Sequence, residues 1–174
     1  MKKRSSLLLI LMLLLVLAGC GAKSAPTEPP ELTVTNAQGA SITAMGGSYD
    51  WDYEAGGGQR TGAIACGMHP LDETLRDSTP ALEMPIAVSA SFYYTVTLDF
   101  GDCAPDSVIL RYWNEQCWGD TQATAEKLTV QRQDDGTYTV ELFPSVGIFE
   151  VDAQWDTEDY CGRAFYSFCT KAAE

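Results

Sequence analysis

The chain has 174 residues, and its 24 acidic side chains against 11 lysines and arginines give a formal net charge of −13. Such a chain is repelled by nucleic acid and by anionic lipid headgroups, so its composition excludes both as electrostatic partners. The length suits one domain that is large enough to bury a real core, preceded by short N-terminal segments.

The N-terminal residues have the pattern of a secretory signal peptide. A basic start, Met-Lys-Lys-Arg, precedes an unbroken apolar run from Leu7 to Leu17. That run is shorter than the ~20 apolar residues that a membrane-spanning helix needs, and a basic head with a short apolar core is typical of an exported protein. Residues 1–19 contain three of the 11 basic residues and no acid, so their removal leaves a formal charge of −16.

The apolar run ends in Leu17-Ala18-Gly19-Cys20, which resembles the lipobox of bacterial lipoproteins at all four positions. In that family the cysteine thiol is diacylated and becomes the first residue of the mature protein. The resemblance implies that Cys20 carries lipid and holds the protein at the extracellular face of the bacterial cell membrane. Residues 20–31 would then be the lipidated cysteine and a tether, which its three prolines and few apolar side chains predict to be disordered.

Residues 32–174 are predicted to form one all-β domain. Alternating side chains indicate strands, and glycine, proline and Asp-Gly turns separate them. The predicted strands are 32–36, 41–53, 60–66, 92–100, 108–113, 128–132, 138–143, 147–155 and 163–170. Residues 67–90 contain three prolines and are expected to be irregular, with a helical turn near 72–76. About seven or eight main strands with this spacing favour an antiparallel sandwich or barrel.

The C-terminal strands favour the sandwich. Gly-Thr-Tyr-Thr-Val (136–140), Pro-Ser-Val-Gly (144–147), a strand ending in Trp155 and Ala-Phe-Tyr-Ser-Phe (164–168) resemble the last three strands of immunoglobulin-like sandwiches. Together with the stretches 42–51, 69–71 and 105–108, they resemble a group of lipid-anchored proteins of Gram-positive bacteria that have no assigned activity. The resemblance implies an immunoglobulin-like β-sandwich at the cell envelope, and it implies no chemistry.

Five cysteines remain after Cys20, and disulfides are permitted outside the membrane. In an immunoglobulin-like sheet, strand 108–113 lies beside 147–155, which lies beside 163–170, and neighbours are antiparallel. A disulfide needs Cα atoms within ~7 Å, so cysteines at the same end of these strands are the possible partners. This arrangement predicts a disulfide-stapled sandwich with the pairs Cys103–Cys161 and Cys117–Cys169.

Cys66 is left over from these pairs. It is either a buried thiol that behaves as a small apolar side chain, a partner for another chain, or a substitute for one of the four paired cysteines.

The same arrangement brings five acidic residues to one end of the sandwich. Calcium binds several oxygen ligands and suits extracellular loops. The cluster therefore predicts a site for calcium or for a cationic partner such as a basic peptide, and the alternative is a pair of acidic loops kept apart by water. Its members are Asp102, Asp106, Asp156, Glu158 and Asp159.

No enzymatic motif is evident in the sequence. His69 is the only histidine, so no more than one imidazole base is available, and no second Cys or His pair at the spacing of a zinc site accompanies Cys66 and His69. Neither a G-x-S-x-G elbow nor an S-x-x-K motif occurs. We expect a non-enzymatic, lipid-anchored extracellular binding or structural module of the cell envelope, with calcium as the one cofactor considered.

The alternative is a cell-wall-active hydrolase or sensor subunit that uses paired carboxylates. The expected partners are the membrane, through the lipid anchor, and an extracellular protein, peptide or glycan.

Overall fold

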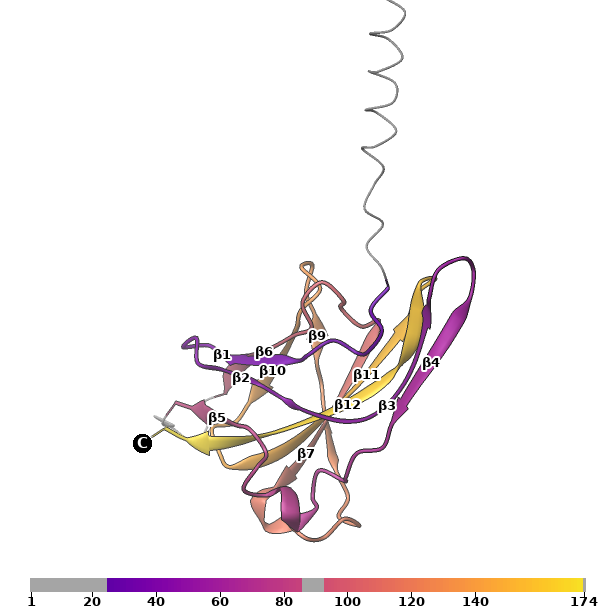
Figure 1. Ribbon diagram of the computed structural model, residues 1–174. Helices are drawn as coiled ribbons and strands as arrows, with labels where there is room; N and C mark the ends of the chain where they lie inside the picture. The colour runs from indigo at the N-terminus through magenta and orange to yellow at the C-terminus, as the bar shows by residue number, and fades with distance from the viewer. Residues whose placement is uncertain (1–24, 86–92, 174) are drawn as a thin grey trace, which may run out of the picture.

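The computed structural model describes residues 25–85 and 93–173. These residues form two β-sheets that pack face to face, as the all-β prediction requires (Figure 1). The predicted signal peptide (1–19), Cys20 and Phe92 of a predicted strand lie outside the described residues. No helix in the described parts of the chain is long and apolar enough to cross a membrane.

The smaller sheet has five strands in the order β2-β1-β6-β10-β9, and all its neighbours are antiparallel. Its members are β1 (Thr33–Asn36), β2 (Ser41–Thr43), β6 (Tyr94–Asp99), β9 (Gln131–Arg132) and β10 (Tyr138–Leu142).

The larger sheet has seven strands, six of them in the order β4-β3-β12-β11-β7-β8. The seventh strand, β5, pairs with β12 in parallel. The prediction of a wholly antiparallel sandwich is therefore wrong at this one pairing. The predicted neighbours β7, β11 and β12 are confirmed. The members are β3 (Met45–Glu54), β4 (Arg60–Ala65), β5 (Ala81–Met84), β7 (Ser107–Asn114), β8 (Glu126–Leu128), β11 (Gly147–Asp156) and β12 (Tyr160–Ala172).

Two irregular segments contain single 3-10 turns. The first, Glu73–Leu75, confirms the helical turn expected near 72–76, and the side chain of Asp72 caps it by accepting the backbone N–H of Thr74. The second, Glu115–Cys117, was not predicted and has Asn114 as its cap. Strand β5 was also missed, because its four residues lie between two prolines in a stretch expected to be irregular.

Two predicted strands are each divided between the sheets. The predicted strand 41–53 is interrupted at buried Ala44, whose backbone N–H donates to Leu32, and β2 joins the small sheet while β3 joins the large one. The predicted strand 128–132 is interrupted at Thr129 and Val130, between β8 of the large sheet and β9 of the small one. An extended chain keeps its alternating pattern when it changes sheet, so the sequence does not reveal these crossings.

The core lies between the inward faces of the sheets. Because side chains alternate along a strand, each inward face is apolar. Trp51 is 1% exposed and packs edge-on against Trp155, with ring centres 5.1 Å apart. Phe149 stacks on Phe168 at 4.9 Å. These four rings all belong to the large sheet, and packed in this way they bury a large apolar area on its inward face.

The N-terminal segment 26–30 is attached to this core. The indole N–H of Trp51 donates to the carbonyl of Pro26 at 2.8 Å, and the hydroxyl of Tyr166 donates to the carbonyl of Pro30 at 2.7 Å. Burial raises the pKa of Tyr166, so the hydroxyl stays protonated and remains a donor. This part of the segment that was expected to be disordered therefore lies against the domain, next to the strands β3 and β12 (Figure 1).

Replacing Tyr166 with phenylalanine tests this attachment. The change removes the donor to Pro30 and is expected to lower the free energy of unfolding by about 1 kcal/mol and to expose residues 26–30 to proteases. Urea denaturation and limited proteolysis with mass spectrometry measure the two effects. Tyr49→Phe is the matched control, since the Tyr49 hydroxyl has no hydrogen bond to a described residue. The attachment would be contradicted if Tyr166→Phe and Tyr49→Phe had the same free energy of unfolding and the same protease cleavage at residues 26–30.

Candidate functional site

The predicted acidic cluster lies at the end of the sandwich where β11 turns into β12. A carboxylate oxygen of Asp106 accepts the backbone N–H of Asp156 at 2.7 Å, and the backbone N–H of Asp106 donates to Gln154. The carbonyl of Glu158 accepts a hydrogen bond from Arg60. These side chains and backbone groups thus stabilise the turn.

The described side chains at this end are not arranged as a group of metal ligands. The described residues contain no group of three or more His, Cys, Asp or Glu side chains arranged to hold a metal ion. The predicted calcium site at Asp102, Asp106, Asp156, Glu158 and Asp159 therefore has no support from the geometry, and the binding of a cationic partner at this end stays a prediction.

The structure shows no disulfide among Cys66, Cys103, Cys117, Cys161 and Cys169, and the two predicted pairings stay predictions. Cys161 accepts a hydrogen bond from Arg60, whereas Cys103 contacts the hydroxyl of Tyr160. Adjacent residues of a strand point to opposite faces, so Cys161 does not point toward Cys103. Burial, with a further contribution from Cys103, raises the pKa of Tyr160 to about 12.

The two cysteines of the second predicted pair, Cys117 and Cys169, lie in the same part of the domain. Cys117 and Cys169 both pack against a small apolar cluster of Leu71, Trp113 and Ile148 on the outer side of the large sheet. Cys66 is exposed, which differs from the buried thiol considered among its three possibilities.

His69 lies beside the same apolar cluster. Its ring packs edge-on against Trp113 at 5.9 Å, and its Nδ1 accepts the backbone N–H of Leu71 at 3.2 Å. The imidazole therefore stabilises the turn that covers this part of the sheet.

A network of charged side chains occupies the centre of the outer face of the large sheet. Asp152 of β11 is fully buried and accepts two hydrogen bonds from Arg163 of β12, each 2.6 Å, and one from Arg111 of β7 at 2.7 Å. Arg111 also binds Glu150 at 2.6 Å. Arg163 in turn lies 4.6 Å from the ring centre of Phe165. The network joins the three central strands of the sheet.

The ionisation of Asp152 follows from these contacts. Burial acts to raise the pKa of the carboxyl group, but the hydrogen bonds and positive charges of Arg163 and Arg111 outweigh it, and the pKa is lowered overall. The same carboxylate raises the pKa of Arg163. All three groups are therefore charged at neutral pH, and each already has a partner of opposite charge.

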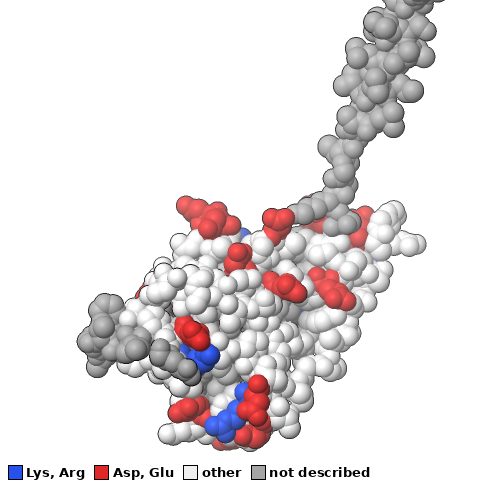
Figure 2. All heavy atoms as spheres, turned by 60° about the vertical axis from the view of Figure 1, so that its left-hand side comes forward, with Lys and Arg blue, Asp and Glu red and all other residues white. Residues whose placement is uncertain are grey.

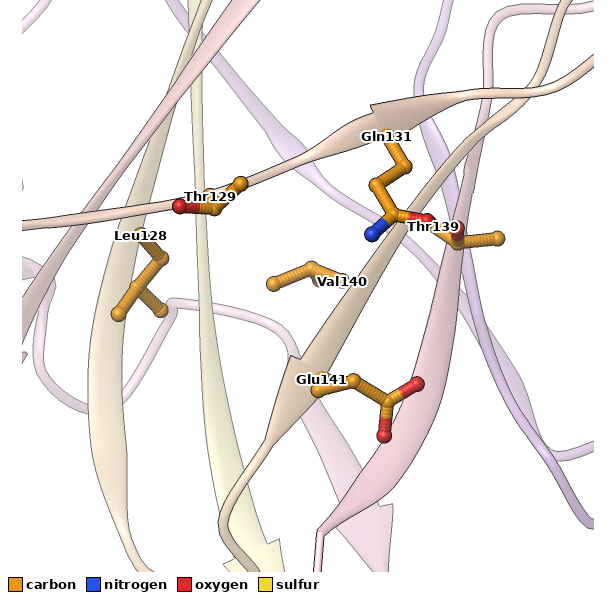
Figure 3. A pocket seen from close by; sticks show the side chains of 6 residues that line it. All are labelled: Leu128, Thr129, Gln131, Thr139, Val140 and Glu141. Atoms are coloured by element: carbon orange, nitrogen blue, oxygen red, sulfur yellow. The ribbon is translucent and has the colours of Figure 1, made fainter.

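One open groove lies along the side of the sandwich, between β8 of the large sheet and β10 of the small one. It consists of an upper hollow of about 280 Å³ and a lower hollow of about 200 Å³, which share Leu128 and Glu141. We call the two hollows together the lateral groove. Figure 3 shows the upper hollow, with Leu128 opposite Val140 and the Gln131 side chain above them.

The walls of the lateral groove combine apolar and uncharged polar side chains with two acids. Tyr93 and Phe143 line the lower hollow and are 59% and 39% exposed, an unusual degree of exposure for aromatic side chains that lie beside each other. Glu126 and Glu141 supply the negative charge. Neither a lysine nor an arginine is among the described residues that line the two hollows.

Sequence reasoning missed the lateral groove. The segment 128–132 was predicted as one strand, whereas the crossing at Thr129 and Val130 separates β8 from β9 and leaves the space beneath it. The available signal was Phe143, an apolar residue directly before Pro144 in a turn. That signal alone does not indicate a groove.

Comparisons with known proteins give no relative. No protein family matches the sequence, and neither a curated protein nor a solved structure shows significant similarity to it.

Replacing Asp152 with asparagine tests the charged network. Removal of one partner from a buried ion pair is expected to lower the free energy of unfolding by about 3 kcal/mol, and Asp134→Asn in an exposed turn is the control. Because the folded-state pKa of Asp152 is lowered, the stability it contributes is present above pH ~4 and is lost as the pH falls through the folded-state pKa. Urea denaturation of wild type and variant should therefore converge in acid. A difference that is independent of pH would contradict this account.

The thiols should react in the order of their exposure and pKa. Cys66 is exposed and should be alkylated first by iodoacetamide at pH 8. Cys169 should be last, because burial raises its pKa to about 11, which leaves roughly one thiol in a thousand ionised. Mass spectrometry of digested samples gives the order, and urea-unfolded protein is the control. A pair that resists alkylation until a reductant is added would instead reveal a disulfide.

Proposed function

We propose that the protein is a non-enzymatic, lipid-anchored binding module with an immunoglobulin-like fold on the extracellular face of a bacterial cell membrane. Lipid on Cys20 would hold it there, and the lateral groove would bind the partner. The lateral groove is the observation that carries the binding role, because exposed aromatic side chains in an open groove of a soluble domain are typical of a recognition surface.

The strand order supports an immunoglobulin-like fold. Such sandwiches have one sheet ordered A-B-E-D and another that contains C-F-G, with C′ added beside C in the variable type. The orders β1-β6-β10-β9 and β8-β7-β11-β12 correspond to A-B-E-D and C′-C-F-G. The correspondence is incomplete, because β6 and β11 contain no cysteine for the inter-sheet disulfide of antibody domains.

A disulfide between Cys117 and Cys169 is part of this proposal. Their shared contact with the cluster of Leu71, Trp113 and Ile148 supports it. It would join the loop after β7 to the end of β12 and make that end of the domain more rigid.

The alternative of a hydrolase with paired carboxylates is less well supported. Glu126 and Glu141 line the same hollow, but the Glu141 side chain turns away from Leu128 (Figure 3) and accepts a hydrogen bond from the hydroxyl of Thr95 at 2.6 Å. A catalytic pair needs both carboxyl groups to flank the bond that is cleaved. The geometry therefore favours binding over hydrolysis.

Replacing Cys20 with alanine tests the anchor. Wild-type protein should fractionate with membranes and carry a mass increase at its N-terminal peptide, whereas the Cys20→Ala protein should lose both. The physical reason is that acyl chains, and not the negative domain, supply the membrane affinity. Cys66→Ala is the matched control and should remain with the membranes. Unchanged fractionation of Cys20→Ala would contradict lipid anchoring.

A further inference from the structure

Strand β10 extends beyond the strand that covers its edge. β9 pairs with only two of its residues, Tyr138 and Thr139, whereas all five of its residues pair with β6 on the other side. The edge of β10 beyond Thr139 has no strand beside it among the described residues. An uncovered strand edge of this kind can accept another extended chain.

The pattern of hydrogen bonds identifies the residue that is available at this edge. The backbone N–H of Gln133 donates to the carbonyl of Thr137 at 2.8 Å, so these two form a hydrogen-bonded pair. Hydrogen-bonded pairs recur at every second residue of an antiparallel ladder. The next hydrogen-bonded pair is therefore Gln131 with Thr139. Glu141 lies two residues beyond Thr139 on β10, so its backbone N–H and C=O point in the same direction as those of Thr139. At Glu141 that direction is the uncovered side of the strand. That side is the lateral groove, which Glu141 lines.

The two faces of the uncovered edge have different chemistry. Val140 faces inward, opposite Leu128 across the upper hollow, so an apolar side chain of an added strand would fit there (Figure 3). The Glu141 side chain points to the other face, where a cross-strand lysine or arginine would form an ion pair with it. An added strand would thus alternate between apolar and basic side chains.

The charge of the domain favours the same kind of partner. On the face in Figure 2, acidic side chains outnumber basic ones, and the basic ones adjoin acids. Arg111 and Arg163 are both bound to carboxylates. A basic partner would be attracted by this field, and a second copy of the chain would be repelled.

We propose that the lateral groove binds an extended, basic segment of another extracellular protein by strand addition to β10. The backbone of Glu141 would pair with the segment, whose apolar side chains would contact Leu128 and Val140 and whose lysines or arginines would lie beside the Glu141 carboxylate. Strand addition takes its affinity from main-chain hydrogen bonds and its specificity from alternate side chains. This inference names the site and partner class of the proposed binding module, and it does not depend on the lipid anchor.

A glycan is a poorer match for the lateral groove. Sugars stack on flat aromatic surfaces, whereas Tyr93 and Phe143 meet edge to face, at 5.9 Å and 68°, and offer no common plane. The backbone N–H and C=O of Glu141, by contrast, can pair with the C=O and N–H of an added strand.

The test measures the binding of an eight-residue peptide of alternating lysine and valine to the full-length protein by fluorescence anisotropy. The comparison peptides have glutamate in place of lysine, or methyl groups on alternate backbone nitrogens. Glu141→Gln removes the charge and keeps the backbone, and Glu141→Pro also removes the backbone N–H, which a strand edge tolerates. Glu158→Gln, at the acidic end of the sandwich, is the control for nonspecific attraction.

The lysine–valine peptide should bind, and Glu141→Gln should weaken its binding about twofold to fivefold, in line with one cross-strand ion pair. Glu141→Pro and the methylated peptide should each weaken it further, and the Glu141 amide should exchange hydrogen more slowly in the complex. Glu158→Gln should change little. Equal binding of the methylated peptide, or a loss caused by Glu158→Gln alone, would overturn strand addition at the lateral groove.

Binding of a chitin oligosaccharide that is abolished by Tyr93→Ala, without binding of the peptide, would also overturn the proposal. If Glu141→Pro does not fold, the methylated peptide still tests the backbone contribution on wild-type protein. Release of Cys20→Ala from membranes is measured independently, so failure of the peptide to bind and failure of the anchor are distinct results.

Discussion

The large sheet depends on the burial of one carboxylate, that of Asp152. An unpaired charge at this position would cost several kcal/mol, so the carboxylate requires both Arg111 and Arg163. Those residues belong to the strands on either side of β11, and both guanidinium groups reach Asp152 only when the strands have one register. The network therefore makes a slip of either neighbour by one residue unfavourable, since a slip would turn a charged side chain toward the core. With the register fixed, the same side chains of the large sheet always face the core, and the core aromatic rings pack among them.

The positions of the long strands follow from the sequence, but the division of strands between the sheets does not. The segments 108–113 and 147–155 are rich in apolar side chains and lie between turn residues, and the structure places strands there. The crossings at Ala44 and at Thr129–Val130 contain neither glycine nor proline themselves, and the two glycines after Ala44 lie inside β3. Short β5 and β9 depend on pairing with distant strands, which local composition does not encode.

The candidate sites show the same distinction. Within the predicted acidic cluster, Asp106 lies beside Asp156, and the backbone N–H of Asp156 donates to the Asp106 carboxylate, so this contact is used inside the cluster. The lateral groove combines residues from β8, β10 and the turn after β10, and no local pattern relates them. A groove of this kind arises where two elements fail to pair, and such a gap is visible only once all the other pairings are known.

The attachment of Pro26 and Pro30 to Trp51 and Tyr166 limits the distance between the domain and a membrane. With lipid on Cys20, six peptide steps would lead to Pro26, and even a fully extended chain of that length spans only about 20 Å. The domain would then stay within roughly its own diameter of the lipid surface and could not search a wide volume. Its partner would have to be a neighbour in the same membrane, or a protein that reaches the base of the cell wall.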